Sequence, residues 1–211
     1  PIERQGGFAE YVSIPDKNIY ELPKNLSIKE APIAEPCAVA LHAVELGEKG
    51  LSKSSIENNR ALVIGAGAIG LLCGLILSRV KNCKDIVIVD TNDKRLKESL
   101  KYLHAEGFKP DSKNIISDHF DIVFDTVGLE ITRQQAIRCI KPGGIIIHIG
   151  LTQPSGTFDF RKTTLQEITL IGTYCYTNKD FEKTLNILKN KEIGSLDWIE
   201  FRNLKEGSLA F

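Results

Sequence analysis

A glycine-rich turn between an apolar strand and an apolar helix constrains the fold of this chain more than any other feature. The sequence ALVIGAGAIG places Gly65, Gly67 and Gly70 in a Gly-x-Gly-x-x-Gly pattern. In such a pattern the first glycine permits a tight turn, the second leaves room for a pyrophosphate, and the third lets the helix pack close to the strand. Ala68 and Ile69 open the helix, where unpaired N–H groups and the helix dipole favour anions. The pattern predicts a phosphate site at this turn.

An acidic residue follows the turn at the spacing of a ribose site. The next apolar strand, IVIVD, ends in Asp90, twenty positions after Gly70. A carboxylate there can accept hydrogen bonds from both ribose hydroxyls and would repel a 2′-phosphate. The two features together predict a dinucleotide-binding chain that prefers NAD to NADP. Arg95, on the helix after Asp90, is a further candidate for cofactor contact, and with Lys94 it keeps NADP binding open.

The same region includes 17 consecutive apolar residues, a length at the lower limit for a membrane-spanning helix. Four glycines interrupt this run, and another apolar strand follows it closely. Alternation of strand and helix is typical of a parallel sheet whose strands are buried on both faces. We therefore expect no membrane as a partner of this chain.

Charge and cysteine content exclude several other classes of protein. Lys and Arg together number 27, as do Asp and Glu, so the chain has no net charge that would attract nucleic acid or an anionic membrane. The five cysteines are widely spaced and form no Cys-x-x-Cys pair, so they indicate neither a disulfide framework nor a zinc knuckle. Free thiols fit a reducing cytoplasm, which is where we expect the protein.

Hydrophobic periodicity predicts an α/β fold with a doubly wound parallel sheet of the Rossmann type. The expected strands cover 61–65, 86–90, 121–126, 144–150 and 168–173, and the expected helices cover 36–46, 68–80, 93–103 and 130–140. A further helix lies in NKDFEKTLNILKNK, with Asn178 as its N-cap. Two short strands, at 8–13 and 17–21, are expected before this unit, and another strand and helix are expected after it, in EFRNLKEGSLAF.

Ligands bind open parallel sheets at the carboxyl ends of the strands. This rule selects more than the glycine turn and Asp90. The residues that follow the third and fourth strands of the unit are also candidates for cofactor binding, namely Thr126, Val127, Gly128, Ile149 and Gly150. The sequence therefore predicts one continuous cofactor site along this edge of the sheet.

The order of motifs along the chain resembles a known family. GGFAEYVSIP, AEPCAVALHAVELG, VIGAGAIGLL, DIVFDTVG, IKPGGIIIHIGL and IGTYCYT resemble the medium-chain, zinc-dependent alcohol dehydrogenase superfamily, in particular its sorbitol and polyol dehydrogenase branch. The resemblance implies a mainly β, GroES-like substrate domain built from both ends of a longer chain. We therefore expect remnants of this catalytic domain at 1–34 and 176–211, an NAD-binding domain at 35–175, and missing sequence at both ends.

The resemblance also implies a catalytic zinc, held in the family by a Cys and a His-Glu pair early in the chain, and those residues are not among the 211 here. Glu35, in Glu35-Pro36, matches a position where polyol dehydrogenases carry a glutamate. It is therefore the candidate metal ligand, or a neighbour of the metal's water. The alternative is a helix-entry glutamate stabilised by the helix dipole. Cys37 fits the ligand position less well.

Further positions carry over from the family. Val39 matches a residue that packs on the nicotinamide, with plain core packing as the alternative. Tyr176 matches a tyrosine near the substrate. Cys175, however, stands where the family has an arginine. Without that guanidinium the chain lacks a group that could donate to several substrate hydroxyls at once, which argues against sugar-alcohol specificity. The four histidines show no ligand spacing, and we interpret His42 and His148 as satisfied structural residues.

These features predict an NAD-dependent and zinc-dependent dehydrogenase that oxidises a small alcohol or polyol by hydride transfer. The 211-residue chain alone is expected to hold NAD and to have no turnover. Two alternatives stay open. One is a zinc-free, NADPH-dependent quinone or enoyl reductase of the same superfamily, which Asp90 opposes. The other is a non-catalytic, NAD-binding structural protein.

The expected strand at 168–173, ITLIGT, bears on association between copies of the chain. It is apolar and lies near the edge of the predicted sheet, where its backbone would be unpaired. Pairing with its counterpart across a two-fold axis would cover that edge. We therefore expect a homodimer or homotetramer, as the resemblance also implies.

Overall fold

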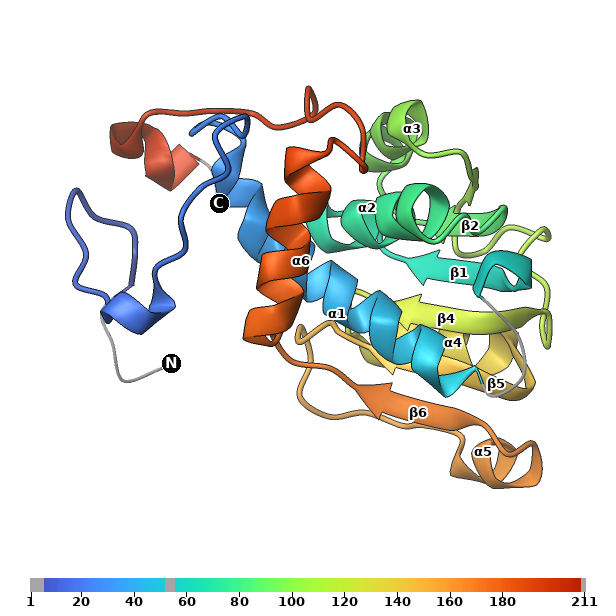
Figure 1. The fold of residues 1–211 in the computed structure, drawn as a ribbon. Helices are drawn as coiled ribbons and strands as arrows, with labels where there is room; N and C mark the ends of the chain where they lie inside the picture. Colours follow the sequence, from blue (N-terminus) through green and yellow to red (C-terminus); the bar gives the residue numbers. More distant parts are fainter. Residues whose placement is uncertain (1–5, 52–55, 210–211) are drawn as a thin grey trace.

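The computed structural model describes residues 6–51 and 56–209. Its centre is a six-stranded sheet with the order β3-β2-β1-β4-β5-β6, in which every neighbouring pair is parallel (Figure 1). The strands are β1 Arg60–Ile64, β2 Asp85–Val89, β3 Glu106–Phe108, β4 Phe120–Asp125, β5 Ile140–His148 and β6 Thr169–Gly172. The strand order reverses direction between β1 and β4, which is where a doubly wound sheet places its ligand. The predicted fold class is confirmed.

Helices cover both faces of this sheet (Figure 1). They are α1 Ala34–Gly50, α2 Ala68–Leu75, α3 Asp93–Tyr102, α4 Glu130–Cys139, α5 Phe160–Leu165 and α6 Asn178–Lys189. Helix α2 continues as a π-helical turn, η4 Ile76–Val80, and short 3₁₀ turns are η1 Asp16–Asn18, η2 Ala31–Ile33, η3 Ile56–Asn58 and η5 Leu204–Leu209. Within the described ranges, every helix is too short or too polar to cross a bilayer.

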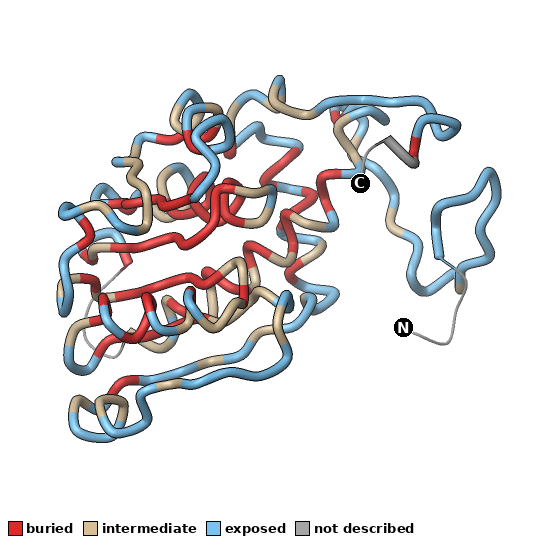
Figure 2. Tube along the Cα trace, turned by 180° about the vertical axis from the view of Figure 1, so that it is seen from behind, coloured by how far each residue is buried: buried red, intermediate tan, exposed pale blue. Residues whose placement is uncertain are grey.

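The buried residues form one core on each face of the sheet. In β1, Ala61 and Val63 join the core that includes α1, α2 and α6, whereas Leu62 and Ile64 join the core beneath α4. Successive side chains of a strand point to opposite faces, so a strand covered on both faces must be apolar throughout. This explains the uninterrupted apolar runs in the sequence, and Figure 2 shows the buried residues concentrated in the sheet and the adjoining helix faces.

The strands predicted at 8–13 and 17–21 are wrong. The chain from Gly6 to Lys24 contains the single turn η1 and no strand in the part that is described, and Tyr11 is 91% exposed. Alternation of apolar and polar residues fits a sheet surface, but a strand also needs a hydrogen-bonded partner strand, and within the described residues none pairs with this segment. The strand predicted in EFRNLKEGSLAF is also wrong, because residues 200–203 are irregular and η5 covers residues 204–209. The two segments lie together at one end of the molecule (Figure 1).

Local hydrogen bonds explain two further differences from the predicted helices. The N-cap of α6 is Thr177 and not Asn178, because the Thr177 hydroxyl accepts from the Asp180 N–H at 3.2 Å while the Asp180 carboxylate accepts from the Thr177 N–H at 2.8 Å. Helix α5 was not predicted. It begins where Asp159 Oδ1 accepts from the Lys162 N–H at 2.8 Å, an Asx cap that the sequence could have signalled.

Substitution of Phe124 tests the packing of the core. Phe124 in β4 has no exposed surface and packs in the core shared with α1, so Phe124→Ala should lower the free energy of unfolding by about 3–5 kcal/mol. Phe201→Ala is the matched control, because Phe201 is 54% exposed and its loss should cost about 0.5 kcal/mol or less. Urea denaturation followed by circular dichroism measures both values, and equal losses would contradict the packing described here.

Candidate dinucleotide site

The turn after β1 shows why each glycine of the motif is needed. Gly65 has a φ of 100°, a left-handed conformation that favours glycine. A Cβ at Gly70 would overlap the carbonyl oxygen of Gly65, so α2 can approach β1 this closely only without a side chain there. Gly67 differs, because a Cβ added to it would meet no atom within 4 Å. The protein itself therefore requires the first and third glycines, whereas the second faces open space.

Helix α2 presents its free N-terminus to that open space. Gly67 is the N-cap, and no side chain caps the helix. The first helical residues, Ala68 and Ile69, carry N–H groups that have no acceptor inside a helix. The first intrahelical bond runs from the Leu71 N–H to the Gly67 carbonyl at 2.9 Å. The arrangement is suited to an anion, which the N–H groups and the helix dipole both favour.

Asp90 lies directly after β2 and is bonded to the glycine turn. It is 9% exposed, its Oδ2 accepts from the Ala66 N–H at 2.7 Å, and its Oδ1 accepts from the Asn92 N–H at 2.7 Å. An ionised carboxylate offers about four lone pairs, so both oxygens retain capacity for ribose hydroxyls. Arg95 lies in the first turn of α3, exposed to solvent. Asp90 therefore lies at the predicted edge of the sheet, beside the glycine turn.

The segments after β4 and β5 complete this edge. The Thr126 hydroxyl donates to the Ile64 carbonyl at 2.8 Å, which fastens the turn after β4 to the end of β1. A Cβ on Gly128, whose φ is 75°, would overlap the carbonyl of Gly150. The N–H groups of Ile149 and Gly150 both donate to the Asp125 carbonyl, at 2.9 and 3.0 Å. The structure thus brings all the predicted rim segments together.

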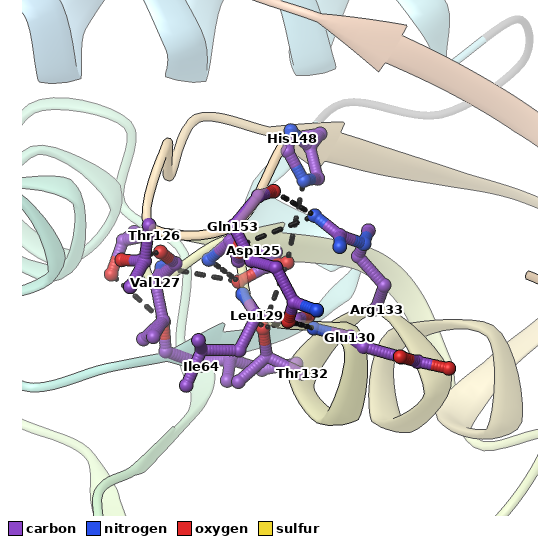
Figure 3. A network of polar contacts seen from close by, with 12 residues as sticks. Ile64, Asp125, Thr126, Val127, Leu129, Glu130, Thr132, Arg133, His148 and Gln153 are labelled. Atoms are coloured by element: carbon purple, nitrogen blue, oxygen red, sulfur yellow. Dashed lines mark hydrogen bonds and ion pairs between the residues drawn. The ribbon is translucent and has the colours of Figure 1, made fainter. Parts of the chain in front are cut away.

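Asp125 supports this edge and was missed by the sequence analysis (Figure 3). Its side chain is fully buried, and Oδ1 accepts from the N–H groups of Val127 at 3.1 Å and Gly128 at 2.9 Å. Its Oδ2 accepts from the Thr132 hydroxyl at 3.1 Å. The signal that could have revealed it is an acidic residue that ends a largely apolar strand immediately before a Gly-containing turn.

Arg133 and Gln153 hold the segment after β5 against the turn after β4 (Figure 3). The Arg133 guanidinium donates to three carbonyls, those of Gly128 at 3.2 Å, Gln153 at 3.1 Å and Ser155 at 2.7 Å. The Gln153 side chain accepts from the Glu130 N–H at 3.0 Å, at the start of α4. These bonds join two segments that are more than twenty residues apart in the sequence. No local sequence pattern could therefore predict these contacts.

The predicted substrate-side residues lie near one another at the start of α1 and after β6. Glu35 is exposed in the first turn of α1, and Val39 is half-buried. Tyr176 stacks on Phe181 with ring centroids 5.5 Å apart. Burial raises the pKa of Tyr176, and the negative charge of Glu35 raises it further. Glu35 is thus close enough to Tyr176 to influence its ionisation.

A zinc site is not formed within the part of the chain that the structure describes. In residues 6–51 and 56–209, no three or more His, Cys, Asp or Glu side chains cluster in a way that could hold a metal ion. Glu35 therefore lacks the companions that a zinc site of three or four ligands needs. Burial raises the pKa of Cys37 to about 12, which disfavours the thiolate form that binds metals. Glu35 and Cys37 alone therefore do not form a zinc site.

The histidines divide into two groups. His42 is a satisfied structural residue as predicted, with Nδ1 2.9 Å from Asp180 Oδ2 between α1 and α6. The same interpretation is wrong for His148, because its Nε2 is buried without a hydrogen-bond partner, 3.8 Å from Asp125 Oδ2. His119 contacts Arg60, and His104 is exposed.

The fold agrees with comparisons to known proteins. Residues 68–190, more than half of the 211, match the family described as zinc-binding dehydrogenase. The chain belongs to this family. The predicted resemblance to the medium-chain, zinc-dependent alcohol dehydrogenases and their polyol branch is confirmed.

Individual relatives cover nearly the whole chain. It is 26% identical over 200 residues to D-xylulose reductase A of Aspergillus oryzae, which is 89% of this chain and 54% of that protein. It is 30% identical over 204 residues to (R,R)-butanediol dehydrogenase of Saccharomyces cerevisiae, which is 91% of this chain and 51% of that protein. The structure of an Escherichia coli alcohol dehydrogenase complexed with NADH superimposes with a TM-score of 0.85 at 21% identity, over 98% of this chain and 61% of the other. That likeness shows the fold, and the chain spans about half the length of these curated relatives.

The two glycines of the turn should differ in their effect on stability. Gly70→Ala should lower the free energy of unfolding by about 2 kcal/mol or more, because the added Cβ meets a backbone oxygen that cannot rotate away. Gly67→Ala, the matched change three residues earlier, meets open space and should cost about 1 kcal/mol at most, as a change of N-cap residue. Urea denaturation compares the two variants, and a Gly67→Ala loss as large as that of Gly70→Ala would contradict the geometry.

Proposed function

We propose that this chain supplies the NAD-binding part of a dehydrogenase that oxidises a small alcohol or polyol by hydride transfer. The observation that carries the proposal is the open space over Gly67, bounded by the uncapped N-terminus of α2 and by Asp90. A pyrophosphate would bind at the N-terminus of α2, and the adenosine ribose would bind at Asp90. The Asp90 carboxylate favours NAD, since a 2′-phosphate would meet its negative charge.

The remaining edge of the sheet would orient the nicotinamide half of the cofactor. Thr126, Val127 and Gly128 follow β4, and Ile149 and Gly150 follow β5, so these five residues continue the site beyond the phosphates. NAD, when bound, supplies the acceptor for the hydride. The protein's part is placement, because the backbone contacts between these two segments fix where the nicotinamide can lie. Val39 of α1 is the proposed packing residue on its face.

The substrate side is proposed from Glu35 and Tyr176. We assign 35–175 to the cofactor domain and the segments on either side to the substrate domain, supported by residues 6–24 and 200–209, which lie together at one end of the molecule (Figure 1). The relatives named above act on butanediol and xylulose by name, which supports a small hydroxylated substrate. Cys175 in place of an arginine weakens a sugar-alcohol assignment. Zinc chemistry, with Glu35 as a ligand, requires donors beyond the described residues, and we derive no step from it.

Titration with nicotinamide cofactors tests the proposal. NADH should bind the chain and enhance its own fluorescence, with an affinity at least tenfold higher than that of NADPH because Asp90 repels the 2′-phosphate. Gly67→Ala should weaken NADH binding by about tenfold or more, since the methyl group fills the space of the pyrophosphate. Gly7→Ala, also in open space but far from the turn, is the control and should bind like the wild type. Absence of NADH binding by the wild type would contradict the proposal.

We also propose that copies of the chain associate through β6. Five free cysteines fit a reducing compartment, and we propose that the protein works in the cytoplasm. β6 is the last strand in the sheet order, and its Leu170 is 45% exposed. Leu170→Asp should convert a dimer or tetramer to smaller species in size-exclusion chromatography with light scattering, because the carboxylate would be buried in the interface. Leu204→Asp, of similar exposure but outside β6, should leave the mass unchanged. A monomeric wild type would contradict this proposal.

A further inference from the structure

His148 and Asp125 occupy paired positions at the carboxyl ends of adjacent strands. Asp125 of β4 is in register with His148 of β5, and His148 is in register with Gly172 of β6. Side chains at paired positions lie on the same face of a sheet. Asp125 faces α4, whose Thr132 donates to it, so His148 also lies on the α4 face. Figure 3 shows its imidazole directed at the Asp125 carboxylate.

The hydrogen-bond inventory of the Asp125 carboxylate is unequal between its two oxygens. Oδ1 has two backbone donors, the N–H groups of Val127 and Gly128. Oδ2 has only the Thr132 hydroxyl at 3.1 Å, and the same hydroxyl is 2.9 Å from the Leu129 carbonyl. A hydroxyl carries a single proton, so Oδ2 shares its donor with a competing acceptor. A buried carboxylate oxygen that has no donor of its own lowers the stability of the fold.

The unpartnered Nε2 of His148 is the nearest group that could supply the missing donor. It lies 3.8 Å from Oδ2 and is buried without a partner, so a small rotation of the ring would satisfy both atoms. The ring has room for this movement. A pocket of about 330 Å³ lies beside it, lined in part by Phe158, Leu170 and Gly172, and a Cβ at Gly172 would meet no atom within 4 Å.

We propose that His148 is a positioning residue for the cofactor turn, which donates from Nε2 to Asp125 and through it holds the Val127 and Gly128 N–H groups in place. The inference rests on the proposed function, because that turn is the proposed site of the nicotinamide half. His148 acts through Asp125 and not by contact with the cofactor. When the imidazole is protonated, Nε2 always carries a proton and the bond to the carboxylate is charge-assisted, which makes it about twice as strong as a neutral bond.

The sign of the pH dependence follows from the groups around the ring. Among the residues that line the pocket, Asp125 of β4 and Arg133 of α4 are the charged ones. The Arg133 guanidinium is already bonded to three carbonyls. Histidine changes its charge between about pH 5 and 8. Cofactor binding should therefore strengthen as the pH falls through this range, because the turn is then held more firmly and the local charge is more positive toward an anionic ligand.

NADH titrations at pH 6 and pH 8 test the proposal on the wild-type chain and three variants. For the wild type, the dissociation constant should be about fivefold lower at pH 6, the change expected when a neutral hydrogen bond becomes charge-assisted. His148→Gln keeps a neutral donor, so its affinity should lie near the wild-type value at pH 8 and be independent of pH. His148→Leu removes the donor and should bind more weakly than the wild type at both values. His104→Gln, at an exposed histidine, is the control and should keep the wild-type ratio.

A fivefold ratio that persists in both His148 variants, or that is lost in the His104 variant, would overturn the inference while the proposed function stands. A wild type that binds no NADH at either pH would contradict the proposed function itself. Hydrogen exchange at the Val127 and Gly128 amides gives a second readout that needs no cofactor. Their protection factors, corrected for intrinsic rates, should be higher at pH 6 than at pH 8 in the wild type and equal in His148→Gln. Equal protection in the wild type would overturn the positioning role.

Discussion

The close approach of α2 to the end of β1 is the constraint on which the rest of the structure depends. Gly70 lies so near the Gly65 carbonyl that any side chain would overlap it. This contact fixes the direction of α2, and with it the position of the uncapped helix N-terminus above Gly67. Asp90 then bonds the turn to the end of β2, and Thr126 bonds the end of β1 to β4. Hydrogen bonds thereby hold the ends of β1, β2 and β4 around the open space above Gly67.

The sequence could predict those parts of the site that depend on residues close together in the chain. The glycine turn, Asp90 and the residues after the third and fourth strands obey short-range rules of spacing, and the structure places them at one edge. Gln153 could not be assigned in the same way, because its partner, the Glu130 N–H, lies in a separate segment that only the tertiary fold brings close. Asp125 differs, because its hydrogen-bond partners Val127, Gly128 and Thr132 follow it closely in the sequence, so a local rule could have revealed it.

The errors in the predicted fold have a related cause. The segment that contains Tyr11 alternates as a strand would, but strand formation depends on a neighbour that the local sequence does not specify, and no strand forms beside it. The opposite case is α6, whose apolar periodicity is local and was predicted correctly. Even there the N-cap was displaced by one residue, because the reciprocal bonds of Thr177 and Asp180 outweigh the preference of Asn178 for that position. Boundaries depend on such individual bonds.

The burial of most cysteines gives the chain selective chemical reactivity. Cys37, Cys73, Cys83 and Cys139 are buried, and burial raises the pKa of each thiol, whereas Cys175 is exposed. Alkylating reagents attack the thiolate of an accessible cysteine. A maleimide dye should consequently label the native chain at one place, next to Tyr176, without any prior removal of the other thiols. Such a probe would report on the junction between α1 and the segment after β6 in real time.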